Sequence, residues 1–430
     1  MASAHSESGL RAELDEIFLA INKHRQILKD LDKQKSAIHR QLNSILDPVA
    51  RLPLEISSEI FVQSLPCSPS FHPDDAPGVL VRVCHGWTAI ALSTPYLWTS
   101  IGAGNKEGPL TAKRHERLFN RWATRAKGCP ISLSLRPSQQ MSEAYLVRRY
   151  AHQLRKLELH LPFKSGSFAS LTAPFHSLKT LTCFGSEPYS AYALRGGFLE
   201  LLRHAPNLEE CTLVGFEFHD VDDSDTDSDG DTDSERTVVP PLNMVSLRHL
   251  KLGQFDRQQF RHANSVILQY LTLPALRSLA VSNPDIPHND FVSFLARSSP
   301  PLRSLSLNWS NYDIGGLEEL LRHLPSLTQL DIRFEPETST STLFERFACA
   351  RDIVPQLRYL TICVHCFPFS QFHIVSDVLE RRRGSLRSFR LRADTGDPGK
   401  CEVLLRDLKV YPKQEMHVFI GDWHHEKTQA

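Results

Sequence analysis

Apolar side chains recur at alternating spacings of three and four residues between positions 10 and 46. This heptad pattern predicts an amphipathic helix, which either folds back on its own chain or forms a coiled coil with another chain, such as a homodimer. Asp47-Pro48 predicts its end, because proline disfavours helical geometry in the residue before it. His24 and Lys35 interrupt the seam and would weaken such a coil or set its register. One seam position holds Leu14, Ile21, Leu28, Lys35 and Leu42, and the other holds Ile17, His24, Leu31, Ile38 and Ile45.

A second apolar pattern, which begins after Pro48, predicts a short helix. Leu52-Pro53 lies at its start, where proline is tolerated. Ile56, Ile60 and Phe61 then repeat at helical spacing.

A loop and a further helix follow. Residues 66–78 (PCSPSFHPDDAPG) have the composition of turns and loops. Ser93-Thr94-Pro95 predicts the end of the helix after this loop. Leu97-Trp98 is then expected to pack back onto the module and to anchor it with an aromatic side chain. A unit of this size builds a thin core, so burial of apolar surface on a partner would stabilise it. One face of this predicted helix carries Leu80, Val83, Cys84, Trp87 and Ala91.

Four motif elements stand in a fixed order in this module: Leu-Pro-x-Glu-Ile from 52, Ile-Phe from 60, Val-Cys-x-x-Trp from 83 and Pro-x-Leu-Trp from 95. The order resembles an F-box over about residues 48–101. The long Pro-rich gap and the phrase ALSTPYLW are similar to F-box proteins of mushroom-forming fungi, which often carry a preceding coiled coil. Two features depart from the family pattern: the loop is longer, and His85-Gly86 replaces the usual basic pair before Trp87.

The resemblance implies that this module docks on the Skp adaptor of an SCF-type (Skp–cullin–F-box) ubiquitin ligase. Core packing is the alternative role for each matching residue and is favoured for Trp87 and Trp98. Leu52, Pro53, Ile60 and Phe61 are the expected direct contacts. The residues that would form or support the adaptor-binding surface are Leu52, Pro53, Ile56, Ile60, Phe61, Val83, Cys84 and Trp87.

A repeated pattern fills the rest of the chain. The motif Leu-x-x-apolar-x-apolar recurs at intervals of 24 to 39 residues, and the longest interval contains an acidic insertion. Short amphipathic segments such as GFLELLRHAPN and GLEELLRHLPS precede several copies, so helix, turn and strand alternate. The copies are LRKLEL at 154, LKTLTC at 178, LEECTL at 208, LRHLKL at 247, LRSLAV at 276, LRSLSL at 302, LTQLDI at 327, LRYLTI at 357 and LRSFRL at 386.

Period and motif resemble leucine-rich repeats, in which stacked units form a continuous core behind a parallel sheet. Charged residues between the repeated leucines are expected at the surface. They form either a solvated face or a basic concave strip that binds an acidic or phosphorylated partner. These charged or basic residues include Arg155, Lys156, Arg248, His249, Arg277, Arg303 and Arg358.

The predicted fold class is α/β: a leucine-rich repeat solenoid over 151–423, preceded by an all-α F-box module over 48–101 and a coiled-coil helix over 10–46. Residues 102–150 are expected to be a linker and the first rung, with a helix around 114–126 and the strand ISLSL at 131. The segment EMHVFIGDW near the end is expected to be a last, atypical strand.

The insertion at 220–235 (DVDDSDTDSDGDTDSE) holds nine acidic residues in 16 and no basic one. Its alternating Asp residues resemble a calcium loop, but the twelfth position counted from Asp225 is Arg236, where such a loop needs a bidentate Glu. A disordered acidic loop is therefore predicted. Possible phosphorylation sites, each with an acidic residue three positions later, are Ser224, Thr226, Ser228 and Thr232.

Bulk composition adds little. Lys+Arg and Asp+Glu both number 49, which gives no argument for a nucleic-acid or membrane partner. The sequence shows neither a membrane-spanning run nor a secretory signal, so cytoplasm or nucleus is expected. Cys363 and Cys366 form a single CxxC without a second pair for zinc, which favours strand cysteines in a reducing compartment.

No catalytic, cofactor or metal motif is evident, since GxSxG, HExxH and a phosphate-binding glycine loop are all missing. Arg381-Arg382-Arg383 is expected to lie on a solvated helix face. The leading hypothesis is a non-catalytic substrate receptor that holds a target protein near a ubiquitin ligase. The alternative is a repeat scaffold whose F-box-like segment packs against the repeats; burial of Leu52, Pro53, Ile60 and Phe61 against them would favour it.

Overall fold

The computed structural model divides into two compact units, residues 1–129 and 130–430. The described residues are 7–66, 69–72, 74–103, 112–136, 143–161, 173–185, 192–215, 217–219, 241–253, 264–282, 288–309, 314–334, 344–345, 353–364, 372–382, 384–393 and 417–421. The predicted acidic loop at 220–235, with its four phosphorylation candidates, lies outside these residues.

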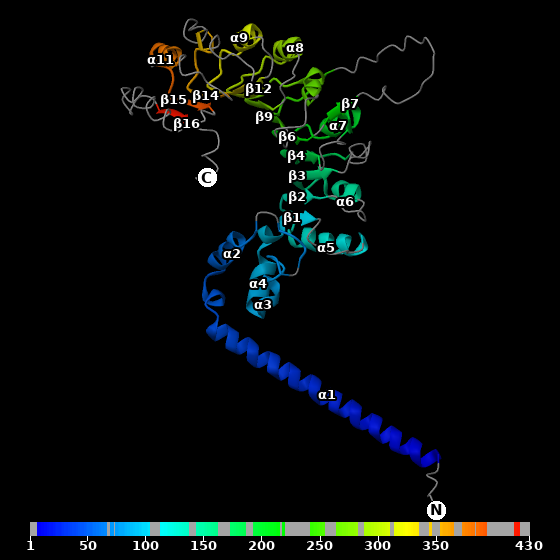
Figure 1. Ribbon diagram of the computed structural model, residues 1–430. Helices are drawn as coiled ribbons and strands as arrows, with labels where there is room; N and C mark the ends of the chain where they lie inside the picture. The colour runs from blue at the N-terminus through cyan, green and yellow to red at the C-terminus, as the bar shows by residue number, and fades with distance from the viewer. Residues whose placement is uncertain are drawn as a thin grey trace, which may run out of the picture. The chain divides into compact units, whose positions relative to one another are not determined.

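The first unit begins with the predicted long helix, α1 (Glu7–Leu46), which extends away from a cluster of short helices (Figure 1). Directly after α1 in the sequence, the turn at Asp47-Pro48 is fixed by a hydrogen bond from the Val49 amide to the Asp47 carboxylate (2.9 Å). The cluster contains η1 (Val49–Arg51), α2 (Leu54–Gln63), α3 (Leu80–Val83), α4 (His85–Ser93), η2 (Pro95–Trp98), β1 (Ser100–Ala103) and α5 (Ala112–Arg125).

The core of the helical cluster is aromatic. Trp98 is fully buried, and its indole N–H donates to the Ala91 carbonyl (2.9 Å). Trp122 of α5 packs edge-on against Trp98 and Phe71, with ring centroids 5.4 and 5.1 Å apart. The helix expected around 114–126 therefore packs onto the core of the first unit.

The second unit is α/β, with a long sheet of parallel strands. Its strands follow the order β2-β3-β4-β6-β9-β11-β12-β13-β14-β15-β16, so each motif copy adds a strand beside the previous one. The bounds are β2 Ile131–Leu135, β3 Leu154–Leu161, β4 Thr180–Gly185, β6 Glu210–Val214, β9 His249–Gly253, β11 Ser278–Val281, β12 Ser304–Trp309, β13 Gln329–Phe334, β14 Tyr359–Val364, β15 Ser388–Ala393 and β16 His417–Gly421.

The repeated leucines explain the register. Alternate side chains of a strand point to opposite faces, and here one face carries the apolar positions in unbroken rows. One row runs through Leu250, Leu279, Leu305, Leu330 and Leu360, which are paired in register and almost fully buried. From β2 to β15 the sheet therefore has one apolar face.

Helices cover this apolar face. The four amphipathic segments α7 (Arg195–Arg203), α8 (His288–Ser298), α9 (Ile314–Arg322) and α11 (Phe372–Arg381) lie along one side of the strands (Figure 1). Their apolar residues, such as Phe294, Leu320 and Leu379, are buried. Short elements complete the unit: α6 (Glu143–Tyr150), η5 (Asn264–Tyr270), β5 (Tyr192–Leu194) paired with β7 (Glu217–His219), and β8 (Leu242–Asn243) paired with β10 (Leu271–Thr272).

The prediction that Arg381-Arg382-Arg383 lies on a solvated helix face is wrong for Arg382, which is buried. Arg382 is only 4% exposed, and its guanidinium donates to the carbonyls of Ile353 (2.9 Å) and Val354 (3.4 Å). Val354 has a positive φ of 45°, a strained geometry for a β-branched residue. Arg382 thus satisfies the carbonyls of a strained turn that lies between two repeats.

Candidate functional site

An exposed apolar stripe on the first unit is the first candidate site. Pro53 precedes α2, and its fixed φ suits the start of the helix. Leu52, Ile56 and Ile60 are spaced four residues apart around this helix start, and their side chains are 41%, 51% and 44% exposed. Leu54 is 49% exposed and widens the stripe. Contiguous apolar side chains of this kind are characteristic of binding surfaces.

The opposite face of α2 anchors the helix. Ser57 is fully buried and donates to the Val49 carbonyl (2.9 Å). Ser58 shares a hydrogen bond with Thr94 (2.8 Å), which ties α2 to the end of α4. Because these polar contacts and Phe61 fix the rotation of α2, its apolar stripe is held toward solvent.

The predicted direct contact at Phe61 needs correction. Phe61 is 1% exposed, and its ring packs against Trp87 with centroids 5.0 Å apart. The residue follows Ile60 directly, so the two side chains point about 100° apart around the helix. Ile60 therefore belongs to the surface, and Phe61 supports it from inside the unit.

The single helix predicted over Leu80–Ala91 is two helices. The break is Cys84, whose backbone is extended (φ −156°, ψ 171°). Its sulfur accepts a bond from the Trp87 amide (3.4 Å) and so caps the start of α4, while its thiol donates to the Asp47 carboxylate (3.5 Å). Cys84 thus has a structural role, linking the end of α1 to α4.

This break moves Val83 away from the core. Val83 is 53% exposed at the end of α3, so it contributes apolar surface. Trp87 is half-buried against Phe61. Two further exposed apolar residues of this unit, Leu92 (38%) and Tyr96 (66%), lie within the segment ALSTPYLW but were not predicted as adaptor contacts.

A column of basic residues at the start of the strands is the second candidate site. The residue after the first leucine of each motif forms a backbone hydrogen bond to its counterpart in the previous repeat, for example from the Arg277 amide to Arg248 and from the Arg303 amide to Arg277, both 2.8 Å. This column, which we call the arginine column, consists of Arg155, Lys179, Glu209, Arg248, Arg277, Arg303, Thr328, Arg358 and Arg387.

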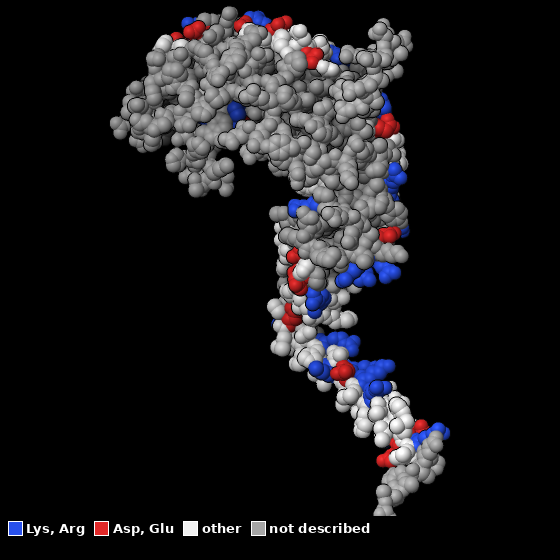
Figure 2. All heavy atoms as spheres, turned by 45° about the vertical axis from the view of Figure 1, so that its right-hand side comes forward, with Lys and Arg blue, Asp and Glu red and all other residues white. Residues whose placement is uncertain are grey.

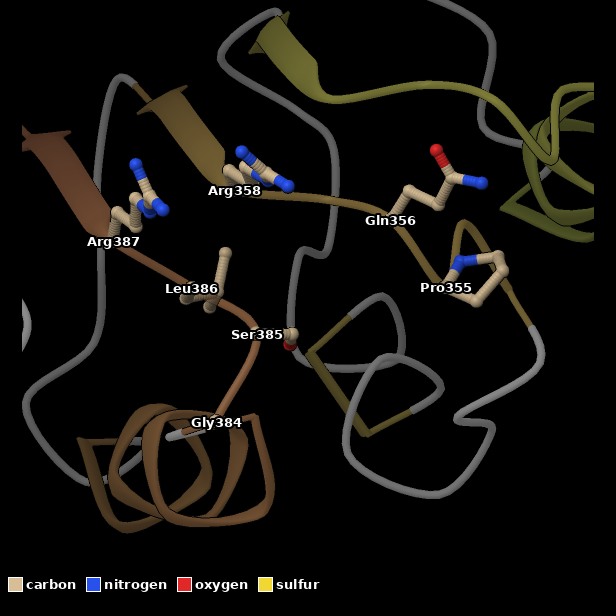
Figure 3. Close-up of a pocket in the computed structure, with 7 residues that line it drawn as sticks. All are labelled: Pro355, Gln356, Arg358, Gly384, Ser385, Leu386 and Arg387. Carbon is tan, nitrogen blue, oxygen red and sulfur yellow. The ribbon is translucent and has the colours of Figure 1, made fainter.

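The arginine column borders an open pocket near its C-terminal end. Arg358 and Arg387 extend side by side from adjacent strands, and their guanidinium groups point in the same direction (Figure 3). Gly384 and Ser385 line the pocket below them, together with Pro355, Gln356 and Leu386. The pocket therefore presents two neighbouring cationic groups, and none of its described lining residues carries a carboxylate.

The buried cysteines have no reactive character. Burial raises the pKa of Cys211 to about 12 and also raises those of Cys183 and Cys363, so these thiols stay protonated. Cys363 lies in β14 as predicted, whereas Cys366 is outside the described residues. Within the described ranges, no group of three or more His, Cys, Asp and Glu side chains is arranged for a metal ion.

Comparison with known proteins found no matching family model and no matching curated protein. In the portion of the chain with described structure, no helix is long and apolar enough to cross a membrane.

Proposed function

We propose that this chain is the substrate-recognition subunit of an SCF-type ubiquitin ligase, with residues 48–101 as an F-box that docks on the Skp adaptor. The exposed stripe Leu52, Ile56 and Ile60 carries this proposal. These residues occupy the motif positions that resemble the family. Ile56 and Ile60 are on α2, whose other face is anchored, and Leu52 lies just before this helix. Apolar surface held outward in this way gains free energy when a partner removes it from water.

The second unit is proposed to be a leucine-rich repeat solenoid that binds the target protein. Support comes from the in-register leucine rows and from the helices that lie along one side of the strands. The open face of the sheet and the arginine column remain available for a partner. The subunit would act by proximity, because a bound target has a raised effective concentration near the ligase. Other subunits would carry out ubiquitin transfer.

The alternative, a repeat scaffold without a ligase role, requires the F-box-like segment to pack against the repeats. Leu52, Pro53 and Ile60 are exposed, and Phe61 is buried by Trp87 of its own unit. Within its own unit the segment therefore buries only Phe61 of these four residues, and the apolar stripe is available for the adaptor that the receptor proposal requires.

The test is co-purification of the full chain with the Skp adaptor. A Leu52→Asp, Ile60→Asp double variant places two charges in the stripe and is expected to abolish binding. The matched control is Leu19→Asp, Val245→Asp, which adds the same two charges at exposed apolar positions outside the stripe (72% and 62% exposed). Circular dichroism checks the fold of both variants.

Adaptor binding by the wild type and the control, but not by the stripe variant, would support the ligase role. A folded wild-type chain that does not bind active adaptor would overturn it and leave the scaffold. Equal binding by both variants would place the adaptor contact elsewhere.

A further inference from the structure

The helix α1 carries an unusually long uncovered apolar seam. It is 40 residues long, and the eight leucine and isoleucine residues at its heptad positions are 39–66% exposed. The space-filling view shows charged groups interspersed with uncharged surface along this helix (Figure 2). In proteins, most helical stability comes from packing of an amphipathic face against other elements. The described part of the chain leaves the seam open, and a partner helix would have to cover it.

A second copy of α1 in parallel orientation fits the seam poorly. In a parallel dimer each seam residue faces its own counterpart. Lys35 would face the partner's Lys35, which places two like charges in the apolar seam. Arg25 and Asp32, which flank the seam, would lie beside the uncharged Ala20 and Ile27 of the partner subunit.

An antiparallel copy removes this conflict. When the helices are aligned so that facing residue numbers add up to 59, each of the ten seam residues faces a seam residue of the other helix. Both polar seam residues then face each other, and a neutral imidazole accepts a hydrogen bond from a lysine ammonium group. The layers pair Leu14 with the partner's Ile45, Ile17 with the partner's Leu42, Ile21 with the partner's Ile38, His24 with the partner's Lys35, and Leu28 with the partner's Leu31.

The same alignment pairs the flanking charges. Arg25 lies next to the partner's Asp32, and the two-fold axis repeats this contact on the other side. Neither side chain forms an ion pair or side-chain hydrogen bond with another described residue of its own chain, whereas Asp30 nearby is engaged by Gln26 and Lys33. Moving the alignment by one heptad in either direction places His24 and Lys35 opposite apolar residues instead.

We propose that α1 forms an antiparallel homodimer in this alignment. Two copies of the chain would then be joined through their N-terminal helices, with the two short-helix clusters at opposite ends of the coiled coil. This inference does not depend on adaptor binding.

Cysteine cross-linking of the full-length protein tests the orientation. Ile21→Cys and Ile38→Cys proteins, distinguished by tags of different size, are oxidised alone and as a mixture. In the antiparallel dimer the mixture forms a disulfide-linked pair, and neither variant links to itself, because its own copies lie about 25 Å apart along the axis. Wild-type protein gives the background from native cysteines. Self-linking of each variant, or a monomer in sedimentation analysis of the wild type, would overturn the proposal.

Charge reversal provides a second test that leaves the seam intact. Arg25→Asp brings two carboxylates together twice per dimer, which is expected to weaken dimerisation about five- to tenfold. The double variant Arg25→Asp, Asp32→Arg is expected to restore it. A parallel dimer predicts no such rescue, and absence of rescue would count against the antiparallel alignment.

The arginine column supports a second inference through a different observation. Arg248, Arg277, Arg303, Arg358 and Arg387 are all exposed, and neighbouring strands of a sheet lie about 4.8 Å apart. At the N-terminal end the column is neutralised, because Lys179 contacts Glu209 at 2.7 Å. Among described residues, no carboxylate forms an ion pair with Arg277, Arg303, Arg358 or Arg387.

We infer that the arginine column binds an Asp- and Glu-rich segment of the target protein; this rests on the proposed receptor function. Arginine forms bidentate hydrogen bonds with carboxylates. The cations lie in a line, one per strand except where Thr328 stands between Arg303 and Arg358. This arrangement suits a series of carboxylates along an extended peptide better than one phosphate group, for which several arginines would converge.

Fluorescence anisotropy of a labelled Asp/Glu-rich peptide tests this with the full chain. The triple variant Arg277→Gln, Arg303→Gln, Arg358→Gln is expected to bind the peptide at least tenfold more weakly than the wild type. The matched control is Arg203→Gln, Arg322→Gln, Arg381→Gln, which removes three exposed helical arginines and is expected to bind normally. A Gln/Asn version of the peptide is expected not to bind.

Several outcomes would overturn the inference: no binding of the acidic peptide, equal weakening by both triple variants, or clearly tighter binding of a singly phosphorylated peptide or an oligonucleotide. The column variant is expected to retain adaptor binding. Loss of peptide binding with retained adaptor binding therefore separates this inference from the proposed receptor function.

Discussion

The rings of Phe61 and Trp87 pack with centroids 5.0 Å apart and planes inclined by 46°. This contact joins α2 to α4 and explains why Ile60, one residue earlier, points to solvent. The orientation of the candidate adaptor surface thus depends on an aromatic pair beneath it.

Substitution of the two adjacent residues should separate stability from binding. Phe61→Ala is expected to lower the free energy of unfolding by about 3–5 kcal/mol, since it removes a fully buried ring. Ile60→Ala is expected to change it by about 0.5 kcal/mol or less, because the side chain is exposed. Urea unfolding measures both, and a comparable loss for Ile60→Ala would show that Ile60 is a core residue.

Trp87 offers a test of a buried polar atom. Its Nε1 is shielded from solvent and has no hydrogen-bond partner among the described residues. Trp87→Phe keeps an aromatic ring against Phe61 and removes this donor, whose burial without a partner costs about 1–3 kcal/mol. The variant is expected to be about as stable as the wild type in thermal unfolding, while Trp87→Ala is expected to be clearly less stable. A large loss for Trp87→Phe would indicate an acceptor for Nε1.

Arg382 is expected to be a stability residue. Arg382→Met leaves the Ile353 and Val354 carbonyls without their donor, which should lower the free energy of unfolding by about 1–3 kcal/mol. Arg381→Met, at the exposed neighbouring position on α11, is the control and should have little effect. Equal effects in urea unfolding would contradict the assigned role of Arg382.

Asp331 should make stability depend on pH. Burial raises its pKa, against the opposing influence of Arg333 and Arg392. The folded state therefore holds the proton more strongly than the unfolded state, so the contribution of Asp331 is favourable at low pH and is lost as pH rises through its folded pKa. Asp331→Asn is expected to raise the free energy of unfolding at pH 7 and to have little effect near pH 3.

The measurement is urea unfolding between pH 3 and 8, with Asp15→Asn on the exposed surface of α1 as the control. A destabilised Asp331→Asn protein at pH 7 would show that its contacts with the two arginines outweigh its desolvation.

The sequence by itself determined the long helix and the nine repeated strands, because heptad and leucine spacings are local patterns with one strong physical cause: the burial of a regular apolar face. It also determined the position of α5 and the strands β2 and β16, where amphipathic or alternating patterns are clear. The tertiary structure decided the details that depend on partners distant in sequence. Cys84 breaks a helix because Asp47 and Trp87 engage its sulfur, Phe61 turns inward because Trp87 lies there, and Arg382 is buried because two carbonyls from the previous repeat need a donor. Periodicity finds an apolar face, but only the packed fold decides which residues of that face remain exposed.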